Sequence, residues 1–471
     1  MTSRFNEIPG SIVAPKGFLA GGVFCDIKRL GTGKGSDKGQ KRDLALIVSE
    51  APAAVAGMFT TNQVCAAPVK VCIERVKKGI AQAVVVNSGN ANACTGRQGL
   101  RDAREMASVA AAALAANMNS RIPRSHPAQR DGRPVAAQHI FVGSTGRIGV
   151  TLPMENVKRG IGEAAKRLGD SKVHADQAAE AIMTSDTRPK QIAVEFKLGG
   201  KAVRIGGICK GAGMIQPGMS ATGTRPAALH ATMLCFITTD AAIHAKALQV
   251  ALQEAVAQSF NRITVDGDMS TNDTVLVLAN GLAGNLPLVA ANVNSREPAS
   301  LPARLRNFKI FQSALNHVCL ELAKMIVRDG EGVHRVVTVR VNGAGSLADA
   351  DAAARAVANS PLVKTSWHGG DPNWGRIIDA LGYSSARVVE EKVDIGYSTP
   401  GSRKILWSLK RGQPTQVPFS RLCAAVRPKE FDLHVNLHLG KAGAMIYAAD
   451  LTEAYVDFNK GDVSDPNSLG G

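Results

Sequence analysis

Apolar residues along the chain follow two repeats, one typical of strands and one typical of helices. Continuous or alternating apolar runs predict strands in DLALIVSE, AGMFTTNQV, AQAVVVNSG, IFVGSTGRIG, MLCFITTDA and HRVVTVRVNG. The helical repeat appears over residues 154–168, with apolar side chains on one face at Met154, Val157, Ile161 and Leu168. Similar repeats predict helices over 101–118, 175–183, 244–260, 308–329, 349–359 and 373–381.

Turn residues connect these elements. IAVEFKLGGKAVRIGGI predicts a hairpin that turns at Gly199-Gly200, and RITVDGDMSTNDTVLVLAN predicts two strands joined by a loop. The last eighty residues, 392–471, are expected to be mostly strands. Helices and strands alternate without a regular β-α-β period, which favours a layered α/β sandwich over a doubly wound parallel sheet.

Length and composition narrow the class of protein. A chain of 471 residues is long enough for two or three domains, and 45% hydrophobic residues predict a substantial core. Aromatic residues make up only 4%, which argues against modules that stack nucleic-acid bases. The formal charge of +17 fits a solvated basic surface, an attraction for anionic small molecules or, third, nucleic-acid binding.

The cysteines and the N-terminus suggest a cellular location. The chain has eight cysteines and no CxxC pair, and most of them lie in apolar segments, as expected for buried thiols in a reducing compartment. MTSRFNEIPG lacks the apolar core of a signal peptide, and the alanine-rich run MASVAAAALAANM is too short to span a bilayer. We therefore expect a cytoplasmic protein.

Three motifs resemble known sites but lack a defining feature. GSTGRIG is followed by VTLP rather than by the helix that a dinucleotide-binding loop must open. DGDMSTND has Thr271 and Val277 where a calcium loop needs glycine and glutamate. His434 and His438 in HVNLH have no nearby third ligand, so no metal site is expected.

The stretch HATMLCFITTDAA contains a candidate nucleophile. A threonine hydroxyl reacts only with a base beside it, and a chain-terminal threonine carries its own base in the α-amine. Thr232 would reach that state if its hydroxyl attacked the Ala231 carbonyl and water then cleaved the resulting ester. Thr145-Gly146, at a predicted strand end, would offer one hydroxyl and one backbone N–H to the oxyanion. The alternative is an ordinary threonine at the start of a strand.

Taken together, ordered motifs along nearly the whole chain resemble the ornithine acetyltransferase family, the bifunctional glutamate N-acetyltransferases of arginine biosynthesis. The motifs are APKGFLAGGV, NSGNANACTG, GSTGRIG, AIMTSDTRPK, KGAGMI with ATML, ITVDGDMSTNDT, RDGEGV, DPNWGRI and DLTEAYVDFN. Each piece alone is weak, but the ordered set is highly specific.

The resemblance implies a fold and a maturation step. The fold would be a layered αββα sandwich of the self-cleaving N-terminal-nucleophile-like type, with a second, smaller α/β domain in the C-terminal half. Cleavage between Ala231 and Thr232 would give an α chain, residues 1–231, and a β chain, residues 232–471. The family implies that these chains assemble as an α2β2 heterotetramer.

The resemblance also implies a ping-pong reaction without a cofactor. Thr232 would take the acetyl group from N2-acetylornithine, releasing ornithine, and pass it to glutamate to form N-acetylglutamate. Some members of the family also use acetyl-CoA as a substrate. No nucleic acid and no membrane take part in this reaction.

Individual residues can be matched to the family's pattern. Thr145 and Gly146 match its oxyanion pair. Residues that match substrate-binding positions are Thr184, Lys210, Thr232, Glu331 and Asn459, with Ser464 where the family has a threonine. The resemblance implies that Lys210 meets a substrate carboxylate and Glu331 an ammonium group.

The chain also departs from the family's pattern. Extra residues, roughly Gly218 to His230, lie directly before the expected cleavage point and include a second Ala-Thr pair, Ala221-Thr222. We favour Ala231-Thr232 because a strand follows it. Residues 121–133 also look inserted, and VHR replaces ATK after GEG.

Two other functions remain open at this point. A self-cleaving amidohydrolase or aminopeptidase would use the same threonine but transfer the acyl group to water. A basic binding protein would need no Thr232, and its nucleic-acid affinity would fall steeply with salt.

Overall fold

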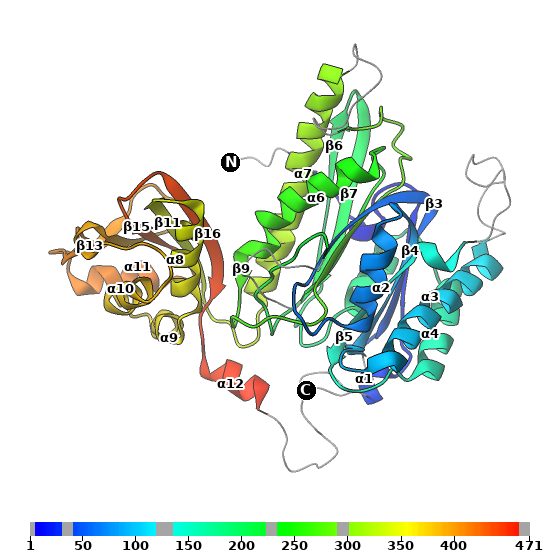
Figure 1. Ribbon diagram of the computed structural model, residues 1–471, viewed down its shortest axis with the longest axis horizontal. Coiled ribbons are helices and arrows are strands. Elements are labelled where there is room, and N and C mark those ends of the chain that lie inside the picture. Colours follow the sequence, from blue (N-terminus) through cyan, green and yellow to red (C-terminus); the bar gives the residue numbers. More distant parts are fainter. Residues whose placement is uncertain (1–4, 31–40, 119–134, 223–232, 290–300, 461–471) are drawn as a thin grey trace.

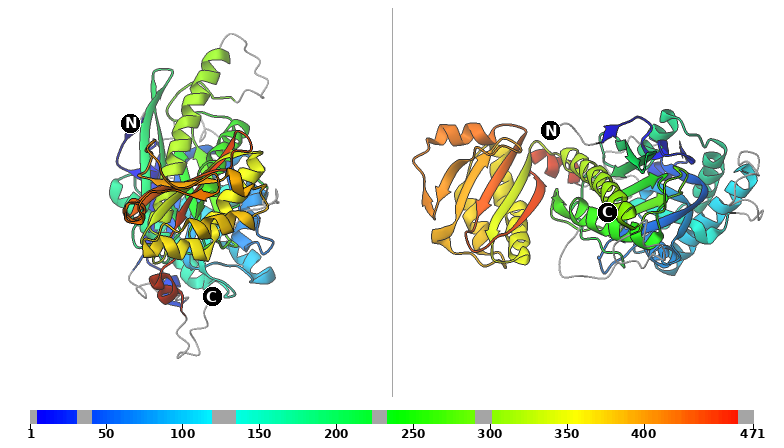
Figure 2. Two further views of the ribbon diagram at one scale, coloured as in Figure 1. Left: turned by 90° about the vertical axis from the view of Figure 1, so that its left-hand side faces the viewer. Right: turned by 90° about the horizontal axis from the view of Figure 1, so that it is seen from above.

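The computed structural model describes residues 5–30, 41–118, 135–222, 233–289 and 301–460. Figure 1 shows two lobes: a larger one drawn from blue to green and a smaller one drawn from yellow to red. Each lobe contains a β-sheet with helices packed against it. The view from above in Figure 2 shows the two lobes side by side along the longest axis of the molecule.

Nine of the described strands form the sheet of the larger lobe, in the order β1-β6-β7-β8-β10-β3-β4-β5, with β2 paired to β3. Their bounds are β1 Asn6–Glu7, β2 Phe18–Val23, β3 Leu44–Phe59, β4 Ile80–Asn90, β5 Ile140–Arg147, β6 Lys190–Leu198, β7 Lys201–Lys210, β8 Leu234–Thr239 and β10 Thr274–Ala279. β4 runs parallel to β5, and β8 runs parallel to β10.

Strand β3 joins the two halves of this sheet. Its first part pairs with β2 and its last part with β10, and the pairing with β4 shifts register between Val48 and Ala53. The sequence predicted two separate strands here, which is wrong, because the small residues of APAAVAG continue the strand rather than interrupt it. One long, irregular strand therefore pairs with β2, β4 and β10.

Helices cover both faces of the larger sheet. One apolar core lies against α2 Ala67–Val76, α3 Gly96–Met118, α4 Met154–Lys166 and α5 Lys172–Ala181, and the other against α6 Ala245–Ala257 and α7 Leu301–Arg328. A short helix, α1, spans Ile27–Leu30. In β8, Leu234 and Phe236 enter the first core while Cys235 and Ile237 enter the second. This alternation is what a strand buried on both faces requires.

The smaller lobe contains seven of the described strands, in the order β14-β13-β12-β15-β11-β16-β9. Their bounds are β9 Ile263–Thr264, β11 Val336–Ala344, β12 Asp394–Ser398, β13 Leu406–Lys410, β14 Gln413–Pro414, β15 Glu430–Asn436 and β16 Ala442–Ala449. β9 comes from the segment between α6 and β10, so it connects the two lobes through the edge of the smaller sheet.

Helices α8 Leu347–Asn359, α9 Pro361–Gly369, α10 Trp374–Gly382 and α11 Phe419–Val426 accompany this second sheet, and their apolar side chains form a third core with it. The last described helix, α12 Glu453–Asn459, extends away from the smaller lobe and lies below the space between the lobes in Figure 1. The sequence missed α9, α11 and α12, which are short helices in segments without a clear repeat.

The expected fold class is confirmed: the protein is a layered α/β structure with a second, smaller α/β domain in its C-terminal half. The hairpin at Gly199-Gly200 also forms as predicted, with both glycines at positive φ (57° and 82°). All eight cysteines are free thiols, and five are buried. No helix in the described part of the chain is long and apolar enough to cross a membrane.

Candidate functional site

The candidate nucleophile Thr232, its neighbour Ala231 and the candidate binding residue Ser464 lie outside the described residues. The described chain resumes at Met233, which is fully buried and whose backbone N–H donates a hydrogen bond to the carboxylate of Asp273. Met233 leads into β8, a strand in the middle of the larger sheet. The covalent neighbour of Thr232 therefore has a fixed and buried position.

Asp273 is a functional candidate that the sequence analysis missed. Burial raises the pKa of its carboxyl group well above the usual value, and the charge of Lys210 opposes that rise only in part. Its Oδ2 atom has no hydrogen-bond partner among the described residues. The sequence pattern assigned this aspartate no role, although it lies in ITVDGDMSTNDT, one of the motifs shared with the family. Asp266 in the same stretch accepts hydrogen bonds from the backbone N–H groups of Met214 and Ile215.

The candidate oxyanion residues, Thr145 and Gly146, lie at the carboxyl end of β5. They pair with Ser88 and Gly89 of the parallel strand β4. Thr145 is buried, and Gly146 has a φ of 129°, which L-residues rarely adopt. A Cβ atom added at Gly146 would lie 2.3 Å from the carbonyl carbon of Gly89. Only glycine fits this position without a shift of the backbone.

A buried asparagine connects this turn to the start of β8. The Nδ2 atom of Asn272 donates hydrogen bonds to the carbonyls of Ala91 (2.7 Å) and Ser144 (2.8 Å). The next residue, Asp273, holds the N–H of Met233. The candidate oxyanion turn and the residue that follows Thr232 are thus tied together through two adjacent side chains.

Lys210 ends strand β7 and lies opposite Leu234 in the antiparallel pairing with β8. Its side chain is buried, and its Nζ atom lies 3.9 Å from Oδ2 of Asp186. Burial lowers the pKa of Lys210, although the charge of Asp186 opposes this. The lysine predicted to meet a substrate carboxylate is therefore held beside the start of β8.

Asp186 organises the loop that carries Thr184. Its carboxylate accepts hydrogen bonds from the backbone N–H groups of Thr184 (3.0 Å) and Gly211 (2.7 Å). It also forms an ion pair with the buried Lys190, whose ammonium group reaches Asp329 as well. Burial alone would raise the pKa of Asp186, but the charges of Lys190 and Lys210 hold it well below the usual value. Asp186 is therefore an anion that positions two predicted binding segments.

Glu331 and Asn459 complete the group. Glu331 lies between α7 and β11, and its Oε2 accepts a 2.9 Å hydrogen bond from Nδ2 of Asn459, at the end of α12. Burial raises the pKa of Glu331, while hydrogen bonds from Ser185 and Asn459 oppose the rise. A Cβ atom at Gly213 would meet the Glu331 carboxylate at 2.2 Å, so the absence of a side chain there makes room for it.

The structure thus brings together Thr184, Lys210, Glu331 and Asn459, four residues that the sequence placed in one site. They come from the α5–β6 loop, the end of β7, the α7–β11 loop and α12. A buried ammonium group and a half-buried carboxylate in one site complement the carboxylate and ammonium groups of an amino acid. This arrangement suits a small zwitterionic substrate.

The two histidines considered as metal ligands in the sequence, His434 and His438, contact different side chains. Nε2 of His434 hydrogen-bonds the hydroxyl of Ser398 at 2.9 Å, whereas Nε2 of His438 lies 2.8 Å from the carboxylate of Asp394. Each histidine has its own structural partner in the smaller sheet.

Fold and site together define an α/β protein with a group of charged side chains beside a central strand, and comparisons with known proteins identify its family. The ArgJ family matches residues 29–461. The arginine biosynthesis bifunctional protein ArgJ of Symbiobacterium thermophilum is 45% identical over 96% of this chain and 98% of its own. The glutamate N-acetyltransferase of Methanocaldococcus jannaschii is 41% identical over 96% of this chain and 98% of its own.

Among solved structures, the ornithine acetyltransferase of Mycobacterium tuberculosis in complex with ornithine is 36% identical, covers 46% of this chain and 100% of the crystallised chain, and has a TM-score of 0.39. The extent and identity of the sequence matches show that the chain belongs to the ArgJ family. The family resemblance read from the sequence motifs is confirmed.

Proposed function

We propose that the protein is a glutamate N-acetyltransferase of arginine biosynthesis, which moves an acetyl group from N2-acetyl-L-ornithine to L-glutamate. The observation that carries the proposal is the grouping of Thr184, Lys210, Glu331 and Asn459 beside the start of β8 in a chain of the ArgJ family. Relatives that match nearly the whole chain are named for this activity or for arginine biosynthesis.

The first step of the proposed mechanism is maturation. The Thr232 hydroxyl attacks the Ala231 carbonyl, and the peptide C–N bond breaks to leave an ester. Water cleaves the ester, giving residues 1–231 with a terminal carboxylate and residues 232–471 with a free threonine amine. The buried position of Met233, held by Asp273, supports this step because it fixes one side of the bond that breaks.

The second step is acetyl transfer to the enzyme. The Thr232 hydroxyl oxygen attacks the acetyl carbonyl of N2-acetylornithine, and its proton passes through the α-amine to the departing nitrogen of ornithine. The amide C–N bond breaks, and an acetyl ester of Thr232 remains. Thr145 and the backbone N–H of Gly146 stabilise the oxyanion, since their turn is tied to the start of β8 through Asn272 and Asp273.

The third step passes the acetyl group to glutamate. The neutral amine of glutamate attacks the ester carbonyl, the C–O bond breaks, and the proton returns to the threonine oxygen. Because both substrates are amino acids with an α-carboxylate, Lys210 serves each in turn, and Glu331 holds the side-chain ammonium group of N2-acetylornithine. Acetyl-CoA is a further candidate acetyl donor, and no other cofactor is proposed. We also propose an α2β2 assembly in the cytoplasm.

A self-cleaving amidohydrolase with the same nucleophile is the alternative. The charged side chains would bind N2-acetylornithine in either reaction, so support for the transferase comes from relatives that match nearly the whole chain and are named for it. The two functions differ in one product: the hydrolase releases acetate without glutamate, whereas the transferase forms N-acetylglutamate only when glutamate is present.

The experiment is an assay of purified protein with N2-acetylornithine, with and without glutamate, in which ornithine, acetate and N-acetylglutamate are measured. The proposal predicts equal amounts of ornithine and N-acetylglutamate, and loss of both in Thr232→Ala. Thr222→Ala, at the other Ala-Thr pair, is the matched control and should keep its activity. Continuous acetate release without glutamate would support the hydrolase instead.

A further inference from the structure

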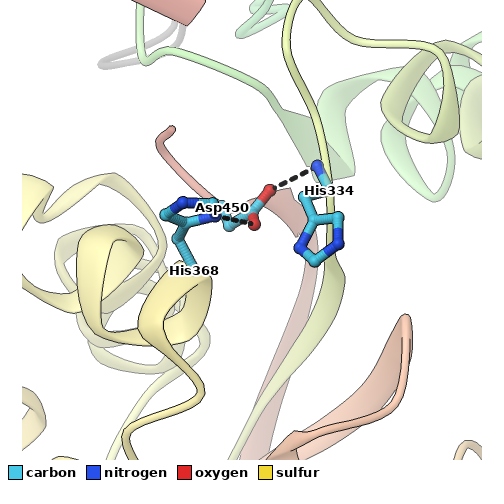
Figure 3. A group of neighbouring side chains, drawn as sticks. All are labelled: His334, His368 and Asp450. Atoms are coloured by element: carbon cyan, nitrogen blue, oxygen red, sulfur yellow. Dashed lines mark hydrogen bonds and ion pairs between the residues drawn. The ribbon is translucent and has the colours of Figure 1, made fainter. Parts of the chain in front are cut away.

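Two histidines and an aspartate that the sequence did not connect meet in the smaller lobe. His334 precedes β11, His368 lies near the end of α9, and Asp450 follows β16. One possible ligand atom from each of these three side chains lies within 4.8 Å of the other two. Figure 3 shows both imidazole rings beside the Asp450 carboxylate. None of these three residues has a role in the proposed acetyl transfer.

Asp450 is the buried member of this cluster, with 3% of its surface exposed. Its Oδ1 atom accepts a 2.9 Å hydrogen bond from the backbone N–H of His334. Its Oδ2 atom has no hydrogen-bond partner among the described residues and lies 3.5 Å from Nδ1 of His368. A buried carboxylate oxygen without a donor is costly unless a cation or a donor meets it.

His368 presents one ring nitrogen to Asp450 and the other to a second carboxylate. Its Nε2 atom lies 2.9 Å from Oε2 of Glu453, the first residue of α12. A carboxylate in this position holds the proton on Nε2 and leaves the lone pair of Nδ1 available, which is the usual arrangement behind a metal-ligating histidine. Nδ1 has no hydrogen-bond partner in the described part of the chain.

His334 closes the group on its solvent side. Its ring centroid is 5.7 Å from that of His368, and the two rings meet edge to face at 78°. His334 is exposed and His368 half-buried, so an ion would reach the cluster from solvent and keep water in its remaining coordination positions. His334 lies in VHR, one of the segments that depart from the family's pattern.

Two cationic side chains of the described chain, Arg335 and Lys364, lie beside this group, and their positive charges would repel a bound metal ion. Nη1 of Arg335 is 3.4 Å from Nδ1 of His334, but its two hydrogens already face the carbonyls of Trp367 and His368. The buried Lys364 donates to the carbonyl of Ala449 and interacts with Asp266 and Asp450.

The two carboxylates of the cluster lie closest to the proposed ligand nitrogens. Asp450 and Glu453 both lie against the imidazole ring of His368, one at each ring nitrogen. The charge directly beside His368 is therefore negative, which favours a cation there.

We propose that His334, His368 and Asp450 form a binding site for a divalent transition-metal ion of the zinc class. Two imidazoles and one carboxylate are donors that suit Zn²⁺, Co²⁺ and Ni²⁺ rather than Mg²⁺ or Ca²⁺, which prefer oxygen ligands throughout. Glu453 orients His368 from behind, and water completes the coordination.

The place of this site suggests what an ion would do. Glu453 begins α12, and Asn459 ends it with its hydrogen bond to Glu331. An ion bound to His368 would strengthen the contact between α9 and the start of α12, and so steady the helix that reaches the amino-acid site. The role is structural, and the ion takes no part in bond breaking.

The test is a titration of the purified full-length protein with Co²⁺, followed by calorimetry and by visible absorption. The site predicts about one equivalent bound per pair of α and β chains and a spectrum without thiolate charge-transfer bands, since no cysteine is a proposed ligand. His368→Gln should remove that equivalent. His438→Asn is the matched control, because His438 also has a carboxylate neighbour, Asp394, but belongs to no group of possible metal ligands within the described ranges.

A second variant keeps the test decisive if His368→Gln folds poorly. Glu453 is exposed, so Glu453→Gln should fold normally and weaken Co²⁺ binding by about 10–100-fold through the loss of the carboxylate behind His368. Binding that is absent in the parent protein, or unchanged in both variants, would overturn the proposal. Binding is measured without substrates, so its failure would leave the acetyl-transfer proposal untouched.

Discussion

The side-chain amide of Asn459 donates a 2.9 Å hydrogen bond to Glu331, 128 positions earlier in the chain. This bond joins the last described helix to the loop before the smaller sheet. It holds the carboxylate at the edge of the candidate site, where Gly213 leaves room for it. The geometry of Glu331 therefore depends on a residue from the far end of the chain.

Removal of the Glu331 charge should weaken donor binding. Glu331→Gln keeps the shape of the side chain but loses the charge-assisted hydrogen bond to the substrate ammonium group, a contribution of about 1.5–3 kcal/mol. We expect the KM for N2-acetylornithine to rise by about 10–100-fold with a smaller change in kcat. Steady-state kinetics checks this. Glu430→Gln, at the surface ion pair with Arg328, should leave KM unchanged.

The hydroxyl of Thr145 should matter for the chemical step rather than for binding. Thr145→Ala removes one oxyanion donor and should lower kcat by about 10²–10³-fold with little change in KM. Thr145→Ser keeps the hydroxyl and should retain most of the rate. Single-turnover kinetics separates the two effects. Equal loss in both variants would mean that the methyl group of Thr145, not its hydroxyl, is what the site needs.

The ion pair between Asp186 and Lys190 should be important for stability. Asp186→Asn removes one of the two carboxylates that neutralise the buried ammonium group of Lys190, leaving only Asp329. Breaking such a buried pair costs about 3–5 kcal/mol. Denaturant unfolding measures the change in the free energy of unfolding. Glu163→Gln breaks an exposed ion pair with Lys166 and should leave the free energy of unfolding nearly unchanged. A cost for Asp186→Asn as small as that of the control would refute the role of this network.

Lys364 should make stability depend on alkaline pH. Burial lowers its pKa from 10.5 to about 8, although Asp266 and Asp450 oppose the shift. Between these two values the unfolded chain holds more protons than the folded one, so this lysine's contribution to the free energy of unfolding rises with pH. The full rise is about 3 kcal/mol.

Comparing the parent protein with Lys364→Met separates the pH-dependent contribution of Lys364 from that of all other titrating groups. At neutral pH the variant escapes the cost of a buried charge, and its advantage should shrink as the pH rises from 8 toward 10.5. Unfolding curves at several pH values provide the measurement. A constant difference between the two proteins across this range would contradict the assignment.

Much of the fold was predictable because local patterns and tertiary structure agree. The repeat of Val157 and Ile161 predicted α4, and the Gly199-Gly200 turn predicted a hairpin with the observed register. The pattern failed where tertiary context decides. β9 and β10 were predicted as two strands joined by a loop, and both strands form, but the pattern did not show that they belong to different sheets, because a two-residue strand carries no sign of the sheet it joins.

The candidate site was predictable from ordered motifs but not from residue spacing. Lys210 and Glu331 alone look like surface charges, and only the family's pattern placed them in one site. Asp273 and the cluster around Asp450 escaped notice for the opposite reason. Their properties come from burial and from partners far away in the sequence, and a local repeat of apolar residues predicts neither of these.

The central claim is that Thr232 carries the acetyl group. The most direct test is the intact mass of the purified protein after incubation with N2-acetylornithine in the absence of glutamate. The account predicts two fragments that meet between Ala231 and Thr232, with one acetyl group on the fragment that begins at Thr232 and its loss once glutamate is added. A fragment that turns over substrate without ever gaining the acetyl group, or an active uncut chain, would contradict it.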